Sequence, residues 1–177
     1  MLLLNKIAFA TSRNELREIA LNMRRLAKIK PGEPFPVVRI LEEYLDYQNY
    51  EFEIISDDIA NDIMGNAYAE TIPSLKLLRV RESVYENAVR GIPRDRFTLA
   101  HELCHLIFHD ELTVSFARNE APVPKYMDPE WQANTFAAEI LAPANELGPL
   151  TIEEICNNYL VSKKVAQIQS SYIYNAS

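Results

Sequence analysis

The stretch 94–109, RDRFTLAHELCHLIFH, holds all three histidines of the 177-residue chain. On a helical wheel of about 100° per residue, its apolar side chains cover roughly two thirds of the circumference. One polar stripe remains, made of Thr98, His101, Glu102, His105 and His109. The pattern therefore predicts a buried helix whose titratable side chains open onto a common cleft.

Two of these histidines have the spacing of metal ligands. His101 and His105 lie one turn apart, about 6 Å along the axis, so both imidazoles can bind one zinc ion. Glu102 lies beside them, where its carboxylate can accept a proton from water without being a ligand. This is the His-Glu-x-x-His pattern of zinc hydrolases. The alternative is a buried helix whose histidines only hydrogen-bond to the backbone. It is disfavoured because burying three titratable groups without a metal or partners is costly.

The third histidine of the stretch is too far along the helix to bind the same ion. In an unbroken helix His109 lies about 12 Å along the axis from His101. The pattern that recruits a third histidine needs a glycine after the second, and residues 106–108 contain none. We expect His109 to support the ligands or to end the helix. With no histidine left and only two cysteines in the chain, the third ligand is expected to be a carboxylate.

A second stretch, 128–143 (DPEWQANTFAAEILAP), can supply that carboxylate. Asp128 as N-cap, Pro129 at the first helical position and a following proline predict a helix over about 129–142. On its wheel, Glu130 falls near the middle of a wide apolar arc, and a carboxylate there needs a cation. Glu130 is therefore the expected ligand; alternatively, it is only a first-turn residue favoured by the helix dipole.

Two further side chains of the same helix are placed by this wheel. Asn134 lies near Glu130 on the arc, and we expect it to support the metal site. Glu139 falls on the opposite, polar side with Gln132 and Thr135, and we expect it to be a solvated surface residue.

Together the two stretches resemble a known family. Residues 79–109, RVRESVYENAVRGIPRDRFTLAHELCHLIFH, followed by DPEWQANTFAAEILAP, resemble the ImmA/IrrE family of zinc metallopeptidases over Lys76–Pro143. The resemblance implies that His101, His105 and Glu130 bind zinc, or another divalent metal, and that Glu102 is the catalytic base. It also implies a substrate class, the helix-turn-helix repressors that control mobile elements, prophages or stress responses.

The chain departs from the family pattern at two places. Cys104 stands where a glycine is usual, and Leu141-Ala142-Pro143 replaces the commoner Leu-Met-Pro ending. Neither departure falls on a ligand.

The remaining sequence predicts an α+β fold in a single domain, 1–177. We expect N-terminal helices in 1–48, a small antiparallel β-sheet in 50–82, zinc-ligand helices in 94–142 and a C-terminal helical hairpin in 151–170. Ser12, Thr151 and Ser162 are expected helix caps. An edge strand near the cleft can pair with an extended substrate segment, or the sheet can be purely structural.

Composition limits the partners. A net charge of −7 disfavours direct nucleic-acid binding, which needs a basic surface, and suits a basic protein substrate. This also disfavours a DNA-binding role for the hairpin. No apolar run approaches the length of a membrane span, so a cytoplasmic protein without a membrane partner is expected. Cys104 and Cys156 are expected to be reduced.

The residues that contact substrate are less defined by the sequence. Arg96 can stabilise the developing oxyanion, although a salt bridge to an acidic neighbour is an equal alternative. Tyr126 and Tyr85 are candidates by proximity in sequence. The segment 109–127 is long enough to border the site. The sequence thus predicts a zinc endopeptidase; the alternative is a zinc-containing regulatory protein that sequesters a repressor, toxin or antitoxin without cutting it.

Overall fold

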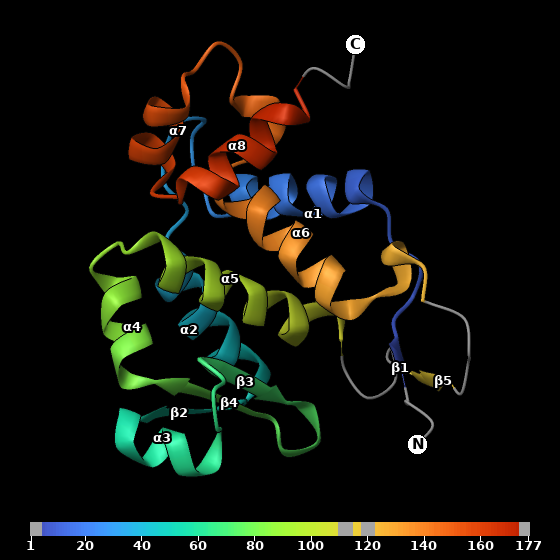
Figure 1. The fold of residues 1–177 in the computed structure, drawn as a ribbon, viewed down its shortest axis with the longest axis vertical. Helices are drawn as coiled ribbons and strands as arrows, with labels where there is room; N and C mark the ends of the chain where they lie inside the picture. The colour runs from blue at the N-terminus through green and yellow to red at the C-terminus, as the bar shows by residue number, and fades with distance from the viewer. Residues whose placement is uncertain (1–4, 110–114, 118–122, 174–177) are drawn as a thin grey trace.

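The computed structural model describes residues 5–109, 115–117 and 123–173. Two of its helices carry the predicted site (Figure 1). Helix α5 (Pro93–Phe108) begins at a proline, whose fixed φ suits the first helical position, and ends with His109 as C-cap. Helix α6 (Pro129–Leu141) begins with Asp128, whose side chain accepts a hydrogen bond from the Glu130 backbone amide. The two helices pack against each other along their length. Both predicted helices are confirmed.

Two N-terminal helices support this pair. Helix α1 (Arg13–Leu26) starts with the predicted capping box at Ser12 and packs on α6. Helix α2 (Val37–Gln48) packs on α5. Both helices bury an apolar stripe, and this packing stabilises them. Neither helix contributes a residue to the predicted site.

The C-terminal hairpin forms as expected. Helix α7 (Ile152–Tyr159) has a capping box at Thr151, and α8 (Lys163–Ser171) has Ser162 as its cap. Figure 1 places both at the end of the molecule opposite the sheet. Helix α8 also contacts α6, so the hairpin packs on the helix that carries Glu130.

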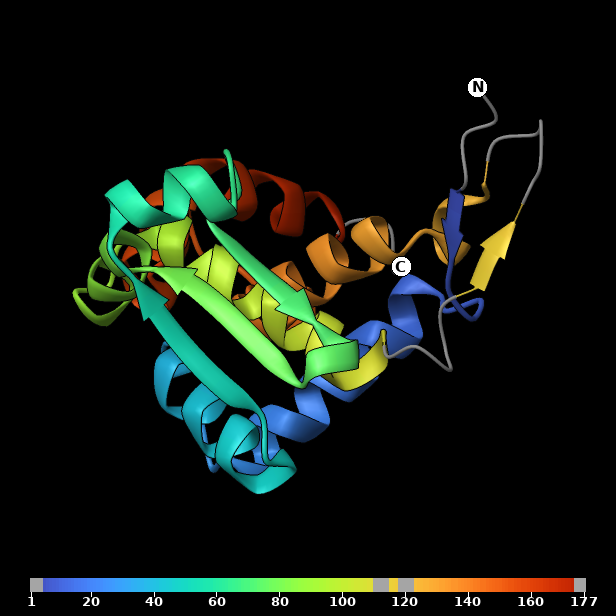
Figure 2. The same cartoon turned by 90° about the horizontal axis from the view of Figure 1, so that it is seen from below.

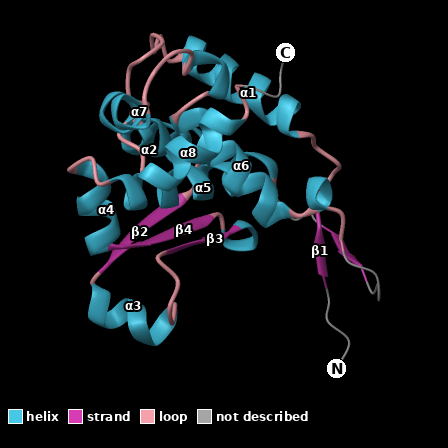
Figure 3. Cartoon of the chain, turned by 45° about the horizontal axis from the view of Figure 1, so that its top comes forward, coloured by secondary structure: helices cyan, strands magenta, loops and turns pink. Residues whose placement is uncertain are grey.

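The sheet has three strands, β2 (Glu51–Ile55), β3 (Ala69–Ile72) and β4 (Leu77–Arg81), in the order β2-β4-β3 (Figure 2). Strand β3 pairs with β4 antiparallel, but β2 pairs with β4 in parallel. The expectation of an antiparallel sheet is therefore wrong for β2. Helix α3 (Asp57–Ile63), which the sequence did not predict, follows β2 and lies apart from the other helices, beyond the sheet (Figure 3). Helix α4 (Glu82–Val89) leads from β4 towards α5.

A second, two-stranded sheet was not predicted. Strand β1 (Asn5–Ile7) pairs antiparallel with β5 (Ser115–Ala117). After β1 the chain is held against the 3-10 turn η2 (Lys125–Met127), where the Ala8 amide donates to Met127 O at 2.9 Å and the Thr11 amide to Tyr126 O at 2.8 Å. The rest of the segment expected to border the site, 110–114 and 118–122, lies outside the described residues.

The core joins the helices to the sheet. Buried apolar side chains from α1, α2, β4, α4, α5, α6, α7 and α8 form one cluster. The α+β class is confirmed. No helix in the described part of the chain is long and apolar enough to cross a membrane.

Candidate metal centre

Three side chains from two helices converge on one point. The Nε2 atoms of His101 and His105 are 3.0 Å apart. The Glu130 carboxylate oxygens are 3.3 Å from His101 Nε2 and 3.4 Å from His105 Nε2. Ligands bound tetrahedrally at about 2.0–2.1 Å lie roughly 3.3 Å from one another. The donor set and its spacing therefore fit a zinc ion.

The glutamate of this triad lies at the surface. Glu130 is in the first turn of α6, and its side chain is 66% exposed, against 17% and 16% for His101 and His105. The helical wheel placed Glu130 in the centre of an apolar face. In the structure its carboxylate faces water instead. The hydrogen bond to His101 and the nearby imidazoles lower the pKa of Glu130 to about 2, although partial burial opposes this. An ionised, water-facing carboxylate at this point is suited to bind a cation.

The two histidines differ in their preferred charge. Burial opposes protonation of His101, but the hydrogen bond to Glu130 and the charge of Glu102 outweigh it and raise its pKa. The pKa of His105 is lowered to about 3, mainly by burial and to a smaller extent by the charge of the neighbouring His101. Proton binding at His101 therefore competes with cation binding more than proton binding at His105 does.

Glu102, the expected base, lies next to the ligands and is hydrogen-bonded to a residue of the sheet. Glu102 is 7% exposed, and its Oε2 accepts a hydrogen bond from the Thr71 hydroxyl on β3 at 2.7 Å. Burial raises the pKa of Glu102, while the Thr71 hydrogen bond lowers it. A carboxylate with a raised pKa is better matched to proton transfer near neutral pH. Thr71 was not singled out by the sequence, because nothing local in its strand marks it.

Both ligand histidines are bonded through their second ring nitrogen. His101 Nδ1 lies 3.2 Å from Asn134 Oδ1 on α6. His105 Nδ1 lies 2.8 Å from His109 Nδ1, and His109 Nε2 lies 2.8 Å from Gln132 Oε1. Such partners fix the orientation of ligand imidazoles. The structure thus brings Asn134 and His109 to the ligands, and adds Gln132, which the sequence interpretation had left on a polar face.

Three residues were considered for substrate contact, and the structure gives the surroundings of each. Arg96 is 5% exposed and donates to Phe35 O at 2.8 Å and to Leu160 O at 3.3 Å. The guanidinium is thus bonded inside the fold, which disfavours the oxyanion role, and Arg96 forms no ion pair with the described residues. The Tyr85 hydroxyl is 2.6 Å from the Glu42 carboxylate on α2. Tyr126 lies in η2 just before α6 and is 49% exposed.

One expectation for α6 is wrong. Glu139 is not solvated but fully buried, and it pairs with Arg13 at 2.8 Å and Arg17 at 3.1 Å. Gln132 and Thr135, on the same side, are buried as well. Helix α1 covers this side of α6 and brings the arginines, which a wheel of α6 alone cannot show.

Two further side chains, those of Lys6 and Cys104, lie close enough to the site to interact electrostatically with it. The Lys6 ammonium on β1 acts electrostatically on His105 and Glu130 and lowers the pKa of both. Cys104, at the family's usual glycine position, is a buried free thiol whose pKa is raised by burial. The thiol therefore stays protonated and is a poor metal ligand.

Comparison with protein families found a match that covers the site. The family model of peptidase M78, described as the IrrE N-terminal-like domain, matches residues 64–169. A comparison with curated protein sequences found no match. The matched region runs from the end of α3 into α8 and includes the metal triad, Glu102 and Thr71.

Proposed function

The chain belongs to the peptidase M78 family, the IrrE N-terminal-like proteins, and we propose that it is a zinc-dependent endopeptidase that cleaves a helix-turn-helix repressor or similar regulatory protein. The observation that supports this most directly is the convergence of His101, His105 and Glu130, whose donor atoms all lie within 4.8 Å of one another. Glu102 stands next to them on the same helix and is not part of the donor set.

Each side chain has a defined part in the proposed mechanism. His101, His105 and Glu130 would hold the ion. When bound, zinc supplies Lewis acidity that acidifies water and polarises a peptide carbonyl. Glu102 accepts the proton of the attacking water and then passes it to the leaving amine nitrogen. Thr71 keeps the Glu102 carboxylate oriented while the proton is transferred.

The sheet provides a place for an extended substrate. Strand β3 is an edge of the three-stranded sheet, packs next to α5, and carries Thr71, which contacts Glu102. A substrate segment that adds to this edge would run past the base and the metal ligands. We place the protein in the cytoplasm, where a DNA-binding repressor is found, and the net charge of −7 favours a basic partner of this kind.

The test compares wild-type protein with Glu102→Gln, His105→Ala and Glu130→Ala. Each is incubated with a helix-turn-helix repressor encoded beside this protein, with and without a chelator, and fragments are read by mass spectrometry. We expect Glu102→Gln to retain one zinc per chain and lose cleavage by about 10²- to 10⁴-fold, because it lacks the base. His105→Ala and Glu130→Ala should lose the metal, read by elemental analysis.

The exposed Glu153 provides a matched control. Glu153→Gln makes the same chemical change away from the site and should cleave like the wild type. Cleavage by Glu102→Gln at the wild-type rate would contradict the mechanism. A repressor that binds zinc-loaded protein and is recovered intact would replace it by sequestration without cleavage.

A further inference from the structure

A buried glutamine links the metal ligands to the N-terminal segment. Gln132 on α6 is 2% exposed. Its Nε2 donates to Phe9 O at 2.7 Å and to Tyr126 O at 2.8 Å, and its Oε1 lies 2.8 Å from His109 Nε2. All the polar atoms of this side chain are therefore engaged.

The orientation of this amide is dictated by its neighbours. A carboxamide NH₂ group has two N–H donors and its oxygen has none. Two backbone carbonyls, those of Phe9 and Tyr126, face one end of Gln132. Only the NH₂ group can satisfy both, because an oxygen placed there would meet two other oxygens. The oxygen of Gln132 is thereby turned towards His109.

This orientation determines which ring nitrogens carry hydrogen. Since Gln132 Oε1 can only accept, His109 Nε2 must be the donor. A neutral imidazole has one donor and one acceptor nitrogen, so His109 Nδ1 accepts. The atom 2.8 Å from it, His105 Nδ1, must then donate. His105 Nε2 is left with a free lone pair, and this atom faces His101 Nε2 at 3.0 Å and Glu130 at 3.4 Å.

We propose that Gln132 is a positioning residue that sets the tautomer of His105 through His109, so that the Nε2 lone pair points at the metal site. The proposal builds on the metal centre of the proposed function. The direction of the hydrogen bonds originates in two backbone carbonyls, which no side-chain substitution removes. The N-terminal segment at Phe9 is in this way part of the support of a ligand histidine.

The chain offers a matched pair of substitutions. Gln132→Met removes the amide and keeps a side chain of similar length. Gln169 on α8 is also fully buried; it donates to Ala142 O at 2.8 Å and accepts from Arg13. Gln169→Met therefore removes the same buried amide from a place that these contacts tie to α1 and the end of α6, away from the histidines.

The three histidines of the chain make the tautomers directly measurable. Protein labelled with ¹⁵N-histidine contains six ring nitrogens, which long-range ¹H–¹⁵N spectra of the metal-free form assign as protonated or free. We expect hydrogen on Nε2 of His109 and on Nδ1 of His105 in the wild type. Gln132→Met should show mixed tautomers of His109 and bind zinc about 10- to 100-fold more weakly in competition with a chromophoric chelator. Gln169→Met should keep the wild-type spectrum and affinity.

The outcomes separate this proposal from the proposed function. Wild-type spectra with hydrogen on Nε2 of His105 would overturn the proposal even if the Gln132 variant failed to fold. A Gln132→Met protein with wild-type tautomers and affinity would also overturn it. If the wild type bound no zinc, the proposed function would fail, and the ring spectra would still decide whether Gln132 controls His105.

Discussion

At the scale of single residues, the protonation of the expected base depends on its burial and on a hydroxyl group from outside its own helix. Glu102 is buried, and burial alone disfavours its charged form and raises its pKa. The Thr71 hydroxyl donates to the charged form and lowers that pKa. The protonation of the base is therefore a balance between the core of α5 and one hydroxyl on β3.

This balance predicts the pH dependence of a Thr71 variant. Thr71→Val removes the hydrogen bond with little change in shape, so burial is opposed less strongly and the pKa of Glu102 rises further. A base with a higher pKa stays protonated to a higher pH, and the acidic limb of the kcat/KM profile should move to higher pH. Thr71→Ser keeps the hydroxyl and should restore the wild-type limb.

The profile is measured with a fluorogenic peptide made from the cleaved sequence. A limb that stays in place for Thr71→Val would show that the hydroxyl does not control Glu102. A fall in kcat at all pH values without movement of the limb would point to a packing defect instead.

The site residues that the sequence identified are those that lie close to one another along the chain. His101, Glu102 and His105 are linked by helical spacing alone, and the helix is the only structure needed to bring them together. Thr71 acts on Glu102 across 31 positions, and no periodicity marks such a pair. Arg96 lies one and a half turns before the histidines, yet its guanidinium is bonded inside the fold, so proximity in sequence was misleading.

At the scale of elements, α6 places two glutamates in opposite environments. Glu130 is 66% exposed beside the ligand histidines, whereas Glu139 is fully buried between Arg13 and Arg17 of α1. One helix thus carries both a water-facing ligand and an internal ion cluster. The position of α6, and with it the position of Glu130, depends on the cluster that joins it to α1.

Removing the buried glutamate should therefore destabilise the fold. Glu139→Ala removes the acidic partner of Arg13 and Arg17, whose side chains are only 16% and 15% exposed, and should lower the free energy of unfolding by roughly 3–5 kcal/mol. The measurement is denaturant unfolding followed by circular dichroism. Glu43→Ala, which breaks an exposed pair with Arg39, should cost less than about 1 kcal/mol. Equal effects of the two substitutions would contradict a structural role for the buried cluster.

Helices were predictable from the sequence where a capping residue marks their first turn. The caps at Ser12, Asp128, Thr151 and Ser162 identify the starts of four helices. The parallel pairing of β2 with β4 and the pairing of β1 with β5 were not predicted, because strands carry no local record of their partner's direction or identity.

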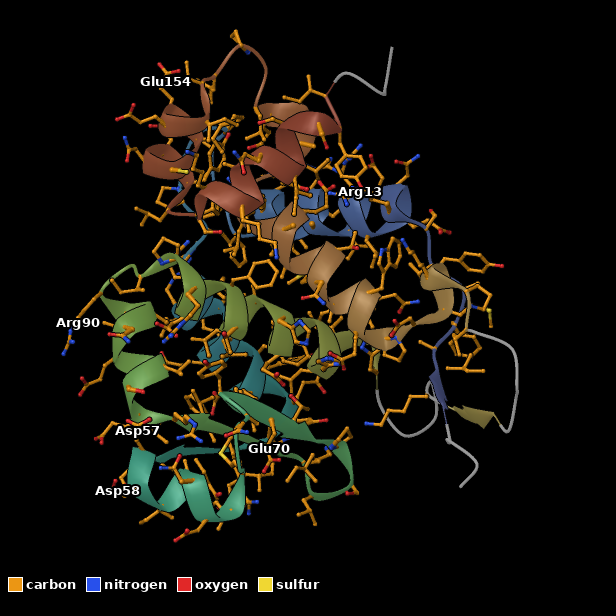
Figure 4. All side chains as sticks on the ribbon, viewed as in Figure 1. Arg13, Asp57, Asp58, Glu70, Arg90 and Glu154 are labelled. Carbon is orange, nitrogen blue, oxygen red and sulfur yellow. The ribbon has the colours of Figure 1, made fainter. Side chains whose placement is uncertain are left out.

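At the scale of the whole molecule, acidic side chains occur far apart. Asp57, Asp58 and Glu70 lie at the end formed by α3 and the sheet, and Glu154 lies at the opposite end on α7 (Figure 4). With a net charge of −7, the protein attracts basic partners over long range.

This charge predicts a salt-dependent rate of encounter. Raising the salt from about 0.02 M to about 0.5 M shortens the screening length, so kcat/KM for a basic repressor should fall while kcat changes little. Initial rates across the series provide the measurement, and a net-neutral peptide with the same scissile sequence is the control. A kcat/KM for the repressor that is independent of salt would contradict electrostatic attraction.

The exposure of Glu130 has a consequence for how the protein acquires its ion. Two imidazoles are already in place within a packed helix, and the third ligand stands beside them at the protein surface, so an ion can reach all three from solvent. Loading can thus follow folding, without any opening of the core. Occupancy would then track the free metal concentration of the surroundings, and a drop in supply would empty the protein reversibly while leaving its architecture intact.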